Sequence, residues 1–235
     1  MRLILDTVIN NSDLPLVDPA MQLVRPSALA VYDMLSNKDK SGNTTLGFSG
    51  TFSAEGAVLD TVDRVINTNV IEQDEISILI CCNLVQRAGV AFSVVSNMTP
   101  ATAPFLGFRN ISTTSDSGTL AVATGLASPN QAVTITSQLI GAWTSRVLRI
   151  KNSEVSTITR SGTVTQAALT NRAKNVAVPI YVNALDASVA AGVKTGTTGT
   201  VGLFAAYSEY LSDSDAIGLM NISAQIMADR GVTLP

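Results

Sequence analysis

The chain has 235 residues, a net charge of −3 and a sequence pI near 4.9, and only 14% of its residues are charged. Its Lys and Arg residues are scattered and form no basic run, which argues against nucleic-acid binding. It contains no histidine, so this chain supplies no Ser-His-Asp triad, Cys-His dyad or histidine metal ligand. Because average soluble domains carry roughly 25% charged residues, the composition favours a surface covered by partners or one coated with Ser and Thr.

The first residues, "MRLILDTVIN", do not form a signal peptide in our interpretation, because Asp6 interrupts the apolar run. No window approaches the roughly 20 apolar residues of a membrane span, so we expect no membrane insertion. Adjacent Cys81 and Cys82 lie too close for an unstrained disulfide, since neighbouring Cα atoms are about 3.8 Å apart. We therefore expect two reduced cysteines that act as small apolar strand residues.

Residues 1–45 differ from the rest of the chain because they contain Pro15, Pro19 and Pro26. Proline fixes φ and donates no ladder hydrogen bond. The segment is therefore predicted to be an extended N-terminal arm that docks on a neighbouring subunit, with a polar turn at 36–43. An N-terminal strand lying against its own domain is the alternative.

From residue 44 onward the pattern predicts an all-β domain built from short strands, with turn signals at the spacing of a sandwich or barrel. Residues 75–85, "EISILICCNLV", are apolar on both faces, as in a central strand. Residues 89–97 are expected to be their hairpin partner. Residues 57–69 fit a short helix or a pair of strands, and residues 151–153 predict a hairpin turn.

A terminal helix over residues 213–229 is the best-marked element. Ser212 suits the N-cap and Asp215 lies at the capping-box position, where Asp stands in place of Glu. Gly231 is a suitable residue just beyond the helix end. The apolar residues at helical spacing, which predict the buried stripe, are Ile217, Met220, Ala224 and Met227.

The segment "GTVGLFAAYSEYLSDSDAIGLM" resembles the closing strand and helix of concanavalin A-like lectin/glucanase modules of the laminin-G-like kind. The resemblance extends upstream through "GAWTSRVLRIKNSEVSTIT" and covers about residues 45–235. It implies an antiparallel β-sandwich (jelly roll) over residues 46–235 that ends in the helix. The chain departs from the family pattern at Asp215, where Glu is usual, and at Ile217, which comes one place late. The matching positions are Gly202, Leu203, Ala205, Tyr207, Leu211, Ser212, Asp213, Asp215 and Ile217.

Members of that family that hydrolyse glycans use paired carboxylates on the concave sheet. Glycosidases of either stereochemistry need two carboxyl groups. The nearest candidate is "EQDE" (residues 72–75), where Glu72 and Asp74 would share one face of a strand. Its turn character favours a solvated turn, and Asp60 and Asp63 are expected at the surface beside Arg64. We therefore predict no catalytic residue and no enzyme.

Other ligand signals in the sequence are weak. Trp143 is expected to pack in the sandwich rather than to stack on a ligand. Tyr207 and Tyr210 are three residues apart, an odd number, so their side chains should face opposite sides of the strand. Asp116 lacks the spaced partners of a calcium loop. No metal ligand, cofactor or ligand-binding residue is therefore assigned.

Modules that are poor in charge and lack disulfides resemble those of tailed-phage virion proteins. This resemblance implies a non-enzymatic structural protein of a phage virion, located in a tail, baseplate or head appendage. Its partners would be other virion proteins, further copies of itself and, at attachment, a host surface glycan. The alternative is a carbohydrate-binding module that recognises host surface glycans. A glycoside hydrolase or lyase is a third, less favoured hypothesis.

Overall fold

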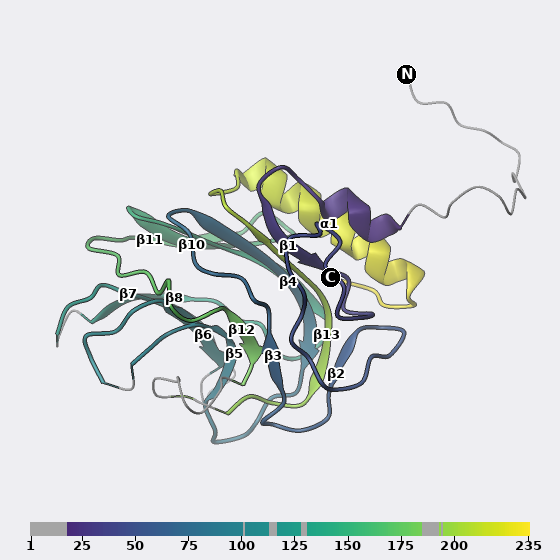
Figure 1. The fold of residues 1–235 in the computed structure, drawn as a ribbon, viewed down its shortest axis with the longest axis horizontal. Coiled ribbons are helices and arrows are strands. Elements are labelled where there is room, and N and C mark those ends of the chain that lie inside the picture. The colour runs from purple at the N-terminus through teal and green to yellow at the C-terminus, as the bar shows by residue number, and fades with distance from the viewer. Residues whose placement is uncertain (1–17, 101, 113–116, 128–130, 185–192, 194) are drawn as a thin grey trace, which may run out of the picture.

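The computed structural model describes residues 18–235 except residues 101, 113–116, 128–130, 185–192 and 194. Two antiparallel sheets pack face to face, and a long helix, α1, lies on the outside of one of them (Figure 1). The predicted all-β sandwich with a C-terminal helix is confirmed. Among the described residues, no helix is both long and apolar enough to span a membrane.

The seven-stranded sheet has the order β1-β13-β4-β9-β10-β11, and β2 also pairs with β13. The six-stranded sheet has the order β3-β12-β5-β6-β7-β8. The strands of the first sheet are β1 (Ala28–Tyr32), β2 (Ala57–Leu59), β4 (Ile76–Leu84), β9 (Thr144–Lys151), β10 (Glu154–Thr159), β11 (Val164–Ala168) and β13 (Gly199–Tyr207). Those of the second are β3 (Val65–Asn67), β5 (Phe92–Ser96), β6 (Phe108–Ser112), β7 (Gly118–Ala123), β8 (Ala132–Thr136) and β12 (Tyr181–Asn183).

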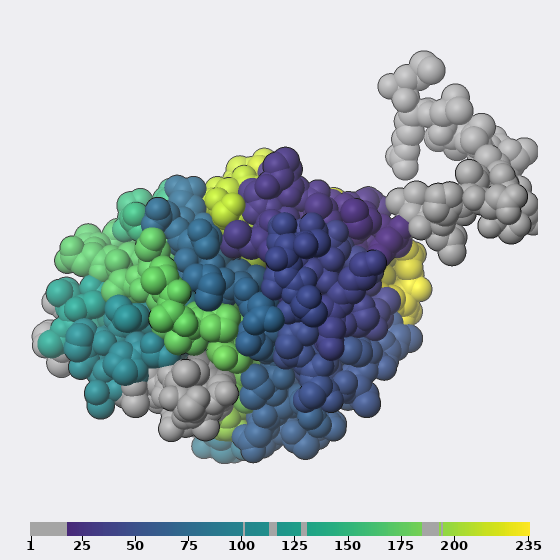
Figure 2. Space-filling view, viewed as in Figure 1, coloured from purple at the N-terminus to yellow at the C-terminus, as the bar shows by residue number. Residues whose placement is uncertain are grey.

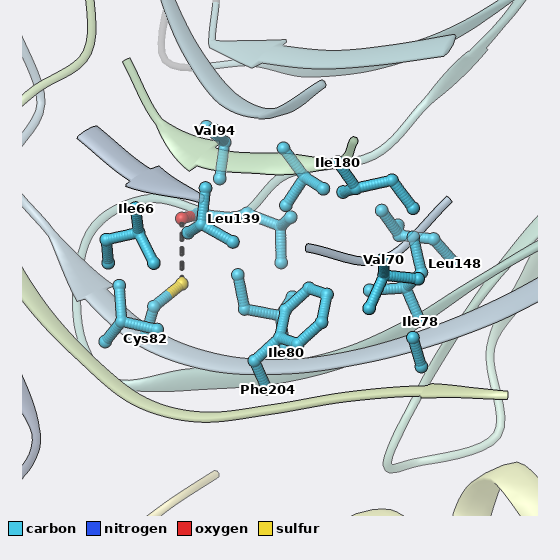
Figure 3. Close-up of a cluster of buried hydrophobic side chains, with 14 of the residues drawn as sticks. Ile66, Val70, Ile78, Ile80, Cys82, Val94, Leu139, Leu148, Ile180 and Phe204 are labelled. Atoms are coloured by element: carbon cyan, nitrogen blue, oxygen red, sulfur yellow. Dashed lines mark hydrogen bonds between the residues drawn. The ribbon is translucent and has the colours of Figure 1, made fainter. Parts of the chain in front are cut away.

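The central strands of the seven-stranded sheet, β4 and β13, are buried on both faces. Successive strand residues point to opposite faces, so β4 sends Ile78 and Ile80 into the core between the sheets and Leu79 toward α1. Figure 3 shows the core between the sheets, with Ile78 and Ile80 of β4 on one side and Val94 of β5 on the other. The apolar run of β4 was therefore correctly interpreted as a central strand with two buried faces.

Cys81 and Cys82 follow the same alternation. Cys81 packs in the core under α1, whereas Cys82 packs between the sheets with its Sγ 3.6 Å from the carbonyl oxygen of Leu139 (Figure 3). Both are free and buried, as predicted. Burial raises the pKa of the Cys82 thiol to about 12 and that of Cys81 well above its ordinary value.

Helix α1 (Asp213–Asp229) has the predicted bounds and caps. The Ser212 hydroxyl accepts from the Asp215 amide at 3.1 Å and donates to its carboxylate at 2.6 Å. At the other end Gly231 has φ +80°, and the amides of Gly231 and Val232 donate to the carbonyls of Ala228 and Met227. These bonds form a Schellman motif, which satisfies carbonyls that the helix itself leaves free.

The buried stripe of α1 differs from the predicted one. Met220 and Met227 are buried as predicted, but Ile217 and Ala224 are only partly buried. Ser223 can lie in the buried stripe although it is polar, because its hydroxyl donates to the Met220 carbonyl at 2.8 Å. A search for apolar residues at helical spacing does not find such a position. The buried residues are Ala216, Leu219, Met220, Ser223, Ile226 and Met227.

The segment predicted as an N-terminal arm contains part of the sandwich. Residues 1–17, with Pro15, lie outside the described residues, and the helical turn η1 (Pro19–Leu23) then leads into β1. Strand β1 pairs with β13, because Tyr32 fits the core between the sheets and Val31 fits the core under α1. The sandwich therefore begins before residue 45, as the alternative of an N-terminal strand anticipated.

Strand pairing differs from the sequence expectation at one hairpin. β4 pairs with β13 and β9, whereas β5 lies in the other sheet beside β12 and β6. Residues 85–91 therefore cross between sheets, because both edges of β4 are already occupied. The predicted turn at 151–153 is confirmed, with Lys151 opposite Glu154. Residues 57–69 contain β2 and β3, one in each sheet.

Candidate ligand-binding face

The outer faces of the two sheets differ in what covers them. Helix α1 packs over β4, β9 and β10 and contacts η1, so the outer face of the seven-stranded sheet is occupied. No described helix packs on the outer face of the six-stranded sheet. In Figure 2 strands β6–β8 (teal) form the left side of the molecule, while parts of α1 (yellow) appear at the top and right. Among the described elements, the outer face of the six-stranded sheet is thus the one without a covering helix.

The pairing of residues between neighbouring strands shows which side chains share this outer face. Residues directly opposite each other in antiparallel strands point to the same side. Arg109 of β6 is opposite Ala121 of β7, which is opposite Thr134 of β8. Their chain neighbours Phe108, Leu120 and Ile135 lie in the core between the sheets, so this row points outward.

A second row runs beside the first, through Ile111, Thr119 and Thr136. We call the two rows together the β6–β8 face. Exposure increases toward the edge strand: Arg109, Ile111 and Thr119 are half-buried, and Thr134 and Thr136 are exposed. The three threonine hydroxyls make no hydrogen bond to the described residues. The face thus presents three hydroxyls, one guanidinium and one aliphatic side chain.

Arg109 makes no hydrogen bond and no ion pair with any described residue, and its buried Nε has no partner. Burial lowers the pKa of its guanidinium. Ser93 of β5, opposite Ile111, also points outward, and its buried hydroxyl has no partner among the described residues. Buried polar groups are nearly always hydrogen-bonded, so both groups are exceptions; Ser93 is fully buried, and only the half-buried Arg109 is within reach of a ligand.

Beyond Arg109 the row continues through Ser96 to Tyr181 of β12, which are both buried. The Tyr181 ring packs against Val65 and Val178. Near the strand ends, the outward residues Ala121 and Ala123 form a small apolar cluster with Met98, Phe105 and Ala173. Packing therefore closes these parts of the face, Ala121 of the first row included, and the accessible residues of the β6–β8 face are Arg109, Ile111, Thr119, Thr134 and Thr136.

Glu72, the first carboxylate of the candidate catalytic pair, was expected in a solvated turn and is instead buried at the end of the six-stranded sheet. Its carboxylate accepts from Arg172 at 2.7 Å, and from the Asn97 side chain and the Asn175 amide at 3.0 Å each. A buried carboxylate persists only when it is paired and hydrogen-bonded, and this one is. It therefore joins β5 to the segment before β12 and is not available to a substrate.

Asp74, the other half of the candidate pair, is exposed and forms an ion pair with Lys174. That ion pair lowers the pKa of the Asp74 carboxyl. Because Glu72 is buried and held by Arg172, the structure does not present the two carboxylates as an accessible acid–base pair.

Asp60, as predicted, pairs at the surface with Arg64, whose Nε and Nη2 lie 2.7 and 2.8 Å from its two oxygens. Exposed Asp63 accepts from the Thr195 hydroxyl at 3.4 Å. Asp116 lies outside the described residues. Within the part of the chain that the structure describes, no cluster of three or more His, Cys, Asp or Glu residues is placed to hold a metal ion.

The aromatic residues noted in the sequence lie on the helix side. Trp143 is partly buried against the core under α1, so its predicted packing role is confirmed. Tyr207 is buried in that core and donates to the Leu23 carbonyl at 2.9 Å. Tyr210 is partly exposed, with the Lys151 Nζ 4.2 Å from its ring centroid. The residues of the β6–β8 face were not identified from the sequence. They come together through the pairing of three strands, which a local sequence pattern does not show.

No family model and no curated protein matches this chain. Solved structures do match. The receptor-binding domain of botulinum neurotoxin D has a TM-score of 0.60 at 9% identity, covering 85% of this chain and 53% of that one. A mutant Trypanosoma rangeli sialidase displaying trans-sialidase activity has a TM-score of 0.61 at 12% identity, covering 86% and 33%.

Botulinum neurotoxin type C, whose cell entry depends upon interaction with two ganglioside molecules, has a TM-score of 0.59 at 10% identity, covering 86% of this chain and 53% of that one. The chain thus spans about half the length of the neurotoxin chains and a third of the sialidase. At these identities the likeness shows the fold alone, which is a lectin-like β-sandwich.

Proposed function

We propose that the chain is a non-enzymatic glycan-binding module that binds its ligand on the β6–β8 face. The observation that carries the proposal is the outward-facing Arg109, which lacks a partner among the described residues and shares its face of the sheet with the hydroxyls of Thr119, Thr134 and Thr136. A hydroxyl both donates and accepts hydrogen bonds, which suits the hydroxyl groups of a sugar. Ile111 adds an apolar contact next to them.

The absence of acid on this face supports binding rather than hydrolysis. Glycosidases need two carboxyl groups across the scissile bond, and neither row of the β6–β8 face contains Asp or Glu. The Glu72 carboxylate is occupied by Arg172, Asn97 and Asn175. The ganglioside dependence of botulinum neurotoxin type C is a further reason to test glycans first.

We also propose that the module belongs to a phage virion protein and packs with other virion proteins or further copies in a tail, baseplate or head appendage. The low content of charged residues, 14%, supports this second candidate. So do Leu106, Leu126 and Val176, large apolar side chains that are exposed. Mass measurement in solution and co-purification with particles test it, and a stable monomer that joins no particle would count against it.

Glycan binding is tested with an array of neutral and acidic glycans. Thr134→Trp should block the β6–β8 face and abolish the binding seen for the wild type. Gln166→Trp is the matched control, because Gln166 is an exposed strand residue of the other sheet. A wild-type chain that binds no glycan at millimolar concentration, or equal loss of binding in both variants, would refute the proposal.

A further inference from the structure

We infer that the glycan recognised on the β6–β8 face is acidic, and that Arg109 binds its carboxylate. This inference rests on the proposed function and adds the chemical class of the ligand. Its starting point is the contrast between Arg109 and other arginines of the chain.

Apart from Arg146, the other arginines of the described chain that are buried or half-buried have partners. Arg149 contacts Asp213 and the Leu211 carbonyl, Arg172 pairs with Glu72, and Arg230 donates to the carbonyls of Asp33 and Gly202. Arg109 has no such group within reach among the described residues, and the lowering of its pKa comes from burial alone, with no contribution from a nearby acid. A half-buried cation without an anion is unfavourable, and a bound carboxylate would relieve that cost.

The exposure of its neighbours defines the side from which an anion would reach Arg109. Its cross-strand neighbours Ser96 of β5 and Ala121 of β7 are buried, whereas Ile111 and Thr119 of the second row are half-buried, so the second row is the accessible side. Thr134 lies two strands away, roughly 10 Å from Arg109, at the exposed end of the row. A sugar that places its carboxylate on Arg109 would therefore extend toward the threonines.

The type of cation favours a carboxylate. The guanidinium group is planar and its paired N–H donors match the two oxygens of a carboxylate, whereas an ammonium group is a single charged point. These features favour an acidic sugar over a neutral one, and a carboxylate over a sulfate.

Matched ligand pairs test the inference by calorimetry. The pairs are sialyllactose with lactose, and trigalacturonate with its methyl ester, and sulfated lactose is added as a third anion. The wild type should bind each carboxylate at least tenfold more tightly than its neutral counterpart, and more tightly than sulfated lactose. Higher salt should weaken this preference.

Arg109→Gln should remove the preference for the acid while leaving the weaker neutral binding, and Arg109→Lys should restore only part of it. Arg146→Gln is the matched control. Arg146 also lacks a partner for its buried Nε, but its cross-strand neighbour Ile80 faces the core between the sheets, so it points inward. Its replacement should leave the preference unchanged, and circular dichroism checks that all the variants are folded.

Equal binding of acid and neutral partner by the wild type would overturn the inference and leave the proposed function in place. An acid preference that survives Arg109→Gln, or that Arg146→Gln also removes, would refute the role of Arg109. Sulfated lactose bound as tightly as sialyllactose would refute the choice of carboxylate. If no probe binds, the proposed function and the inference both fail.

Discussion

Arg149 and Arg109 occupy comparable positions, each pointing outward from an inner strand of its sheet, but they have opposite surroundings. Arg149 on the seven-stranded sheet donates to Ser156, to the Leu211 carbonyl and to Asp213 at the start of α1. Arg109 on the six-stranded sheet makes no such contact with the described residues. The helix and the segment leading into it satisfy Arg149 on one sheet, whereas Arg109 on the other sheet has no partner among the described residues.

The burial patterns of the strands reflect the same difference. All residues of β4 except Asn83 are buried, whereas β8 has exposed Thr134 and Thr136 on either side of buried Ile135. A strand covered on both faces is apolar throughout, and a strand covered on one face alternates. The central strands of the seven-stranded sheet are therefore stabilised by packing on both faces, whereas β8 of the six-stranded sheet packs on one face only.

The largest effect is expected at the ion pair that fastens the six-stranded sheet, which lacks a covering helix among the described residues. Arg172→Met should destabilise the protein by about 3–5 kcal/mol, because it leaves the buried Glu72 carboxylate without its partner. Urea unfolding measures the change. Replacing both residues with Met should cost much less than the single change, and a single change that costs under about 1 kcal/mol would show that the pair is dispensable.

On the covered sheet, Met220→Ala should cost about 2–5 kcal/mol, because it opens a cavity between α1 and the strands. Ile217→Ala, at the partly buried margin of the helix, is the control and should cost less. Thermal or urea unfolding compares the two variants. If Ile217→Ala proves the more damaging, Ile217 and not Met220 lies at the centre of the contact between the helix and the sheet.

Loss of the helix cap should have a smaller effect. Ser212→Ala should cost about 1 kcal/mol at pH 7, since the Asp215 amide loses its acceptor. Hydrogen bonds from Ser212 and then Arg25 lower the pKa of Asp215 below its ordinary value of 3.8. The stabilisation linked to this carboxylate is therefore complete above that ordinary value and disappears as the pH falls through the lower, folded-state value.

The difference in stability between Ser212→Ala and wild type should accordingly narrow on acidification below about pH 4. Unfolding at a series of pH values measures it. Gln225→Ala, an exposed change within the same helix, should remain within about 0.5 kcal/mol of wild type at each pH. A difference that is constant with pH would mean that the Asp215 carboxylate does not take part in the cap.

The smallest effect on stability is expected on the β6–β8 face itself. Thr134→Ala should change the unfolding free energy by no more than about 0.5 kcal/mol, because the side chain is exposed. The same change should weaken glycan binding in the array. A loss of stability above about 1 kcal/mol would show that the face supports the sandwich and is not kept for a ligand.

The elements that could be predicted from sequence are those with local causes. Ser212, Asp215 and Gly231 define the ends of α1 through contacts within a few residues, and the unbroken apolar run of β4 reflects its two covered faces. The strand partners of β5 and the row Arg109–Ala121–Thr134 depend on contacts between distant segments. Glu72 was misplaced for the same reason, since its partner Arg172 is 100 residues away.

The thiols of the adjacent cysteines can report on two different local opening motions of the protein. Cys81 faces α1 and Cys82 faces the space between the sheets, so one thiol is protected by the helix and the other by the pairing of the two sheets. Local opening exposes buried groups without global unfolding. In Cys82→Ala the reaction rate of the remaining thiol would time detachment of the helix. In Cys81→Ala the reaction rate of the Cys82 thiol would measure how fast the two sheets separate. Comparison of the two rates would show whether the helix or the pairing of the sheets opens more readily.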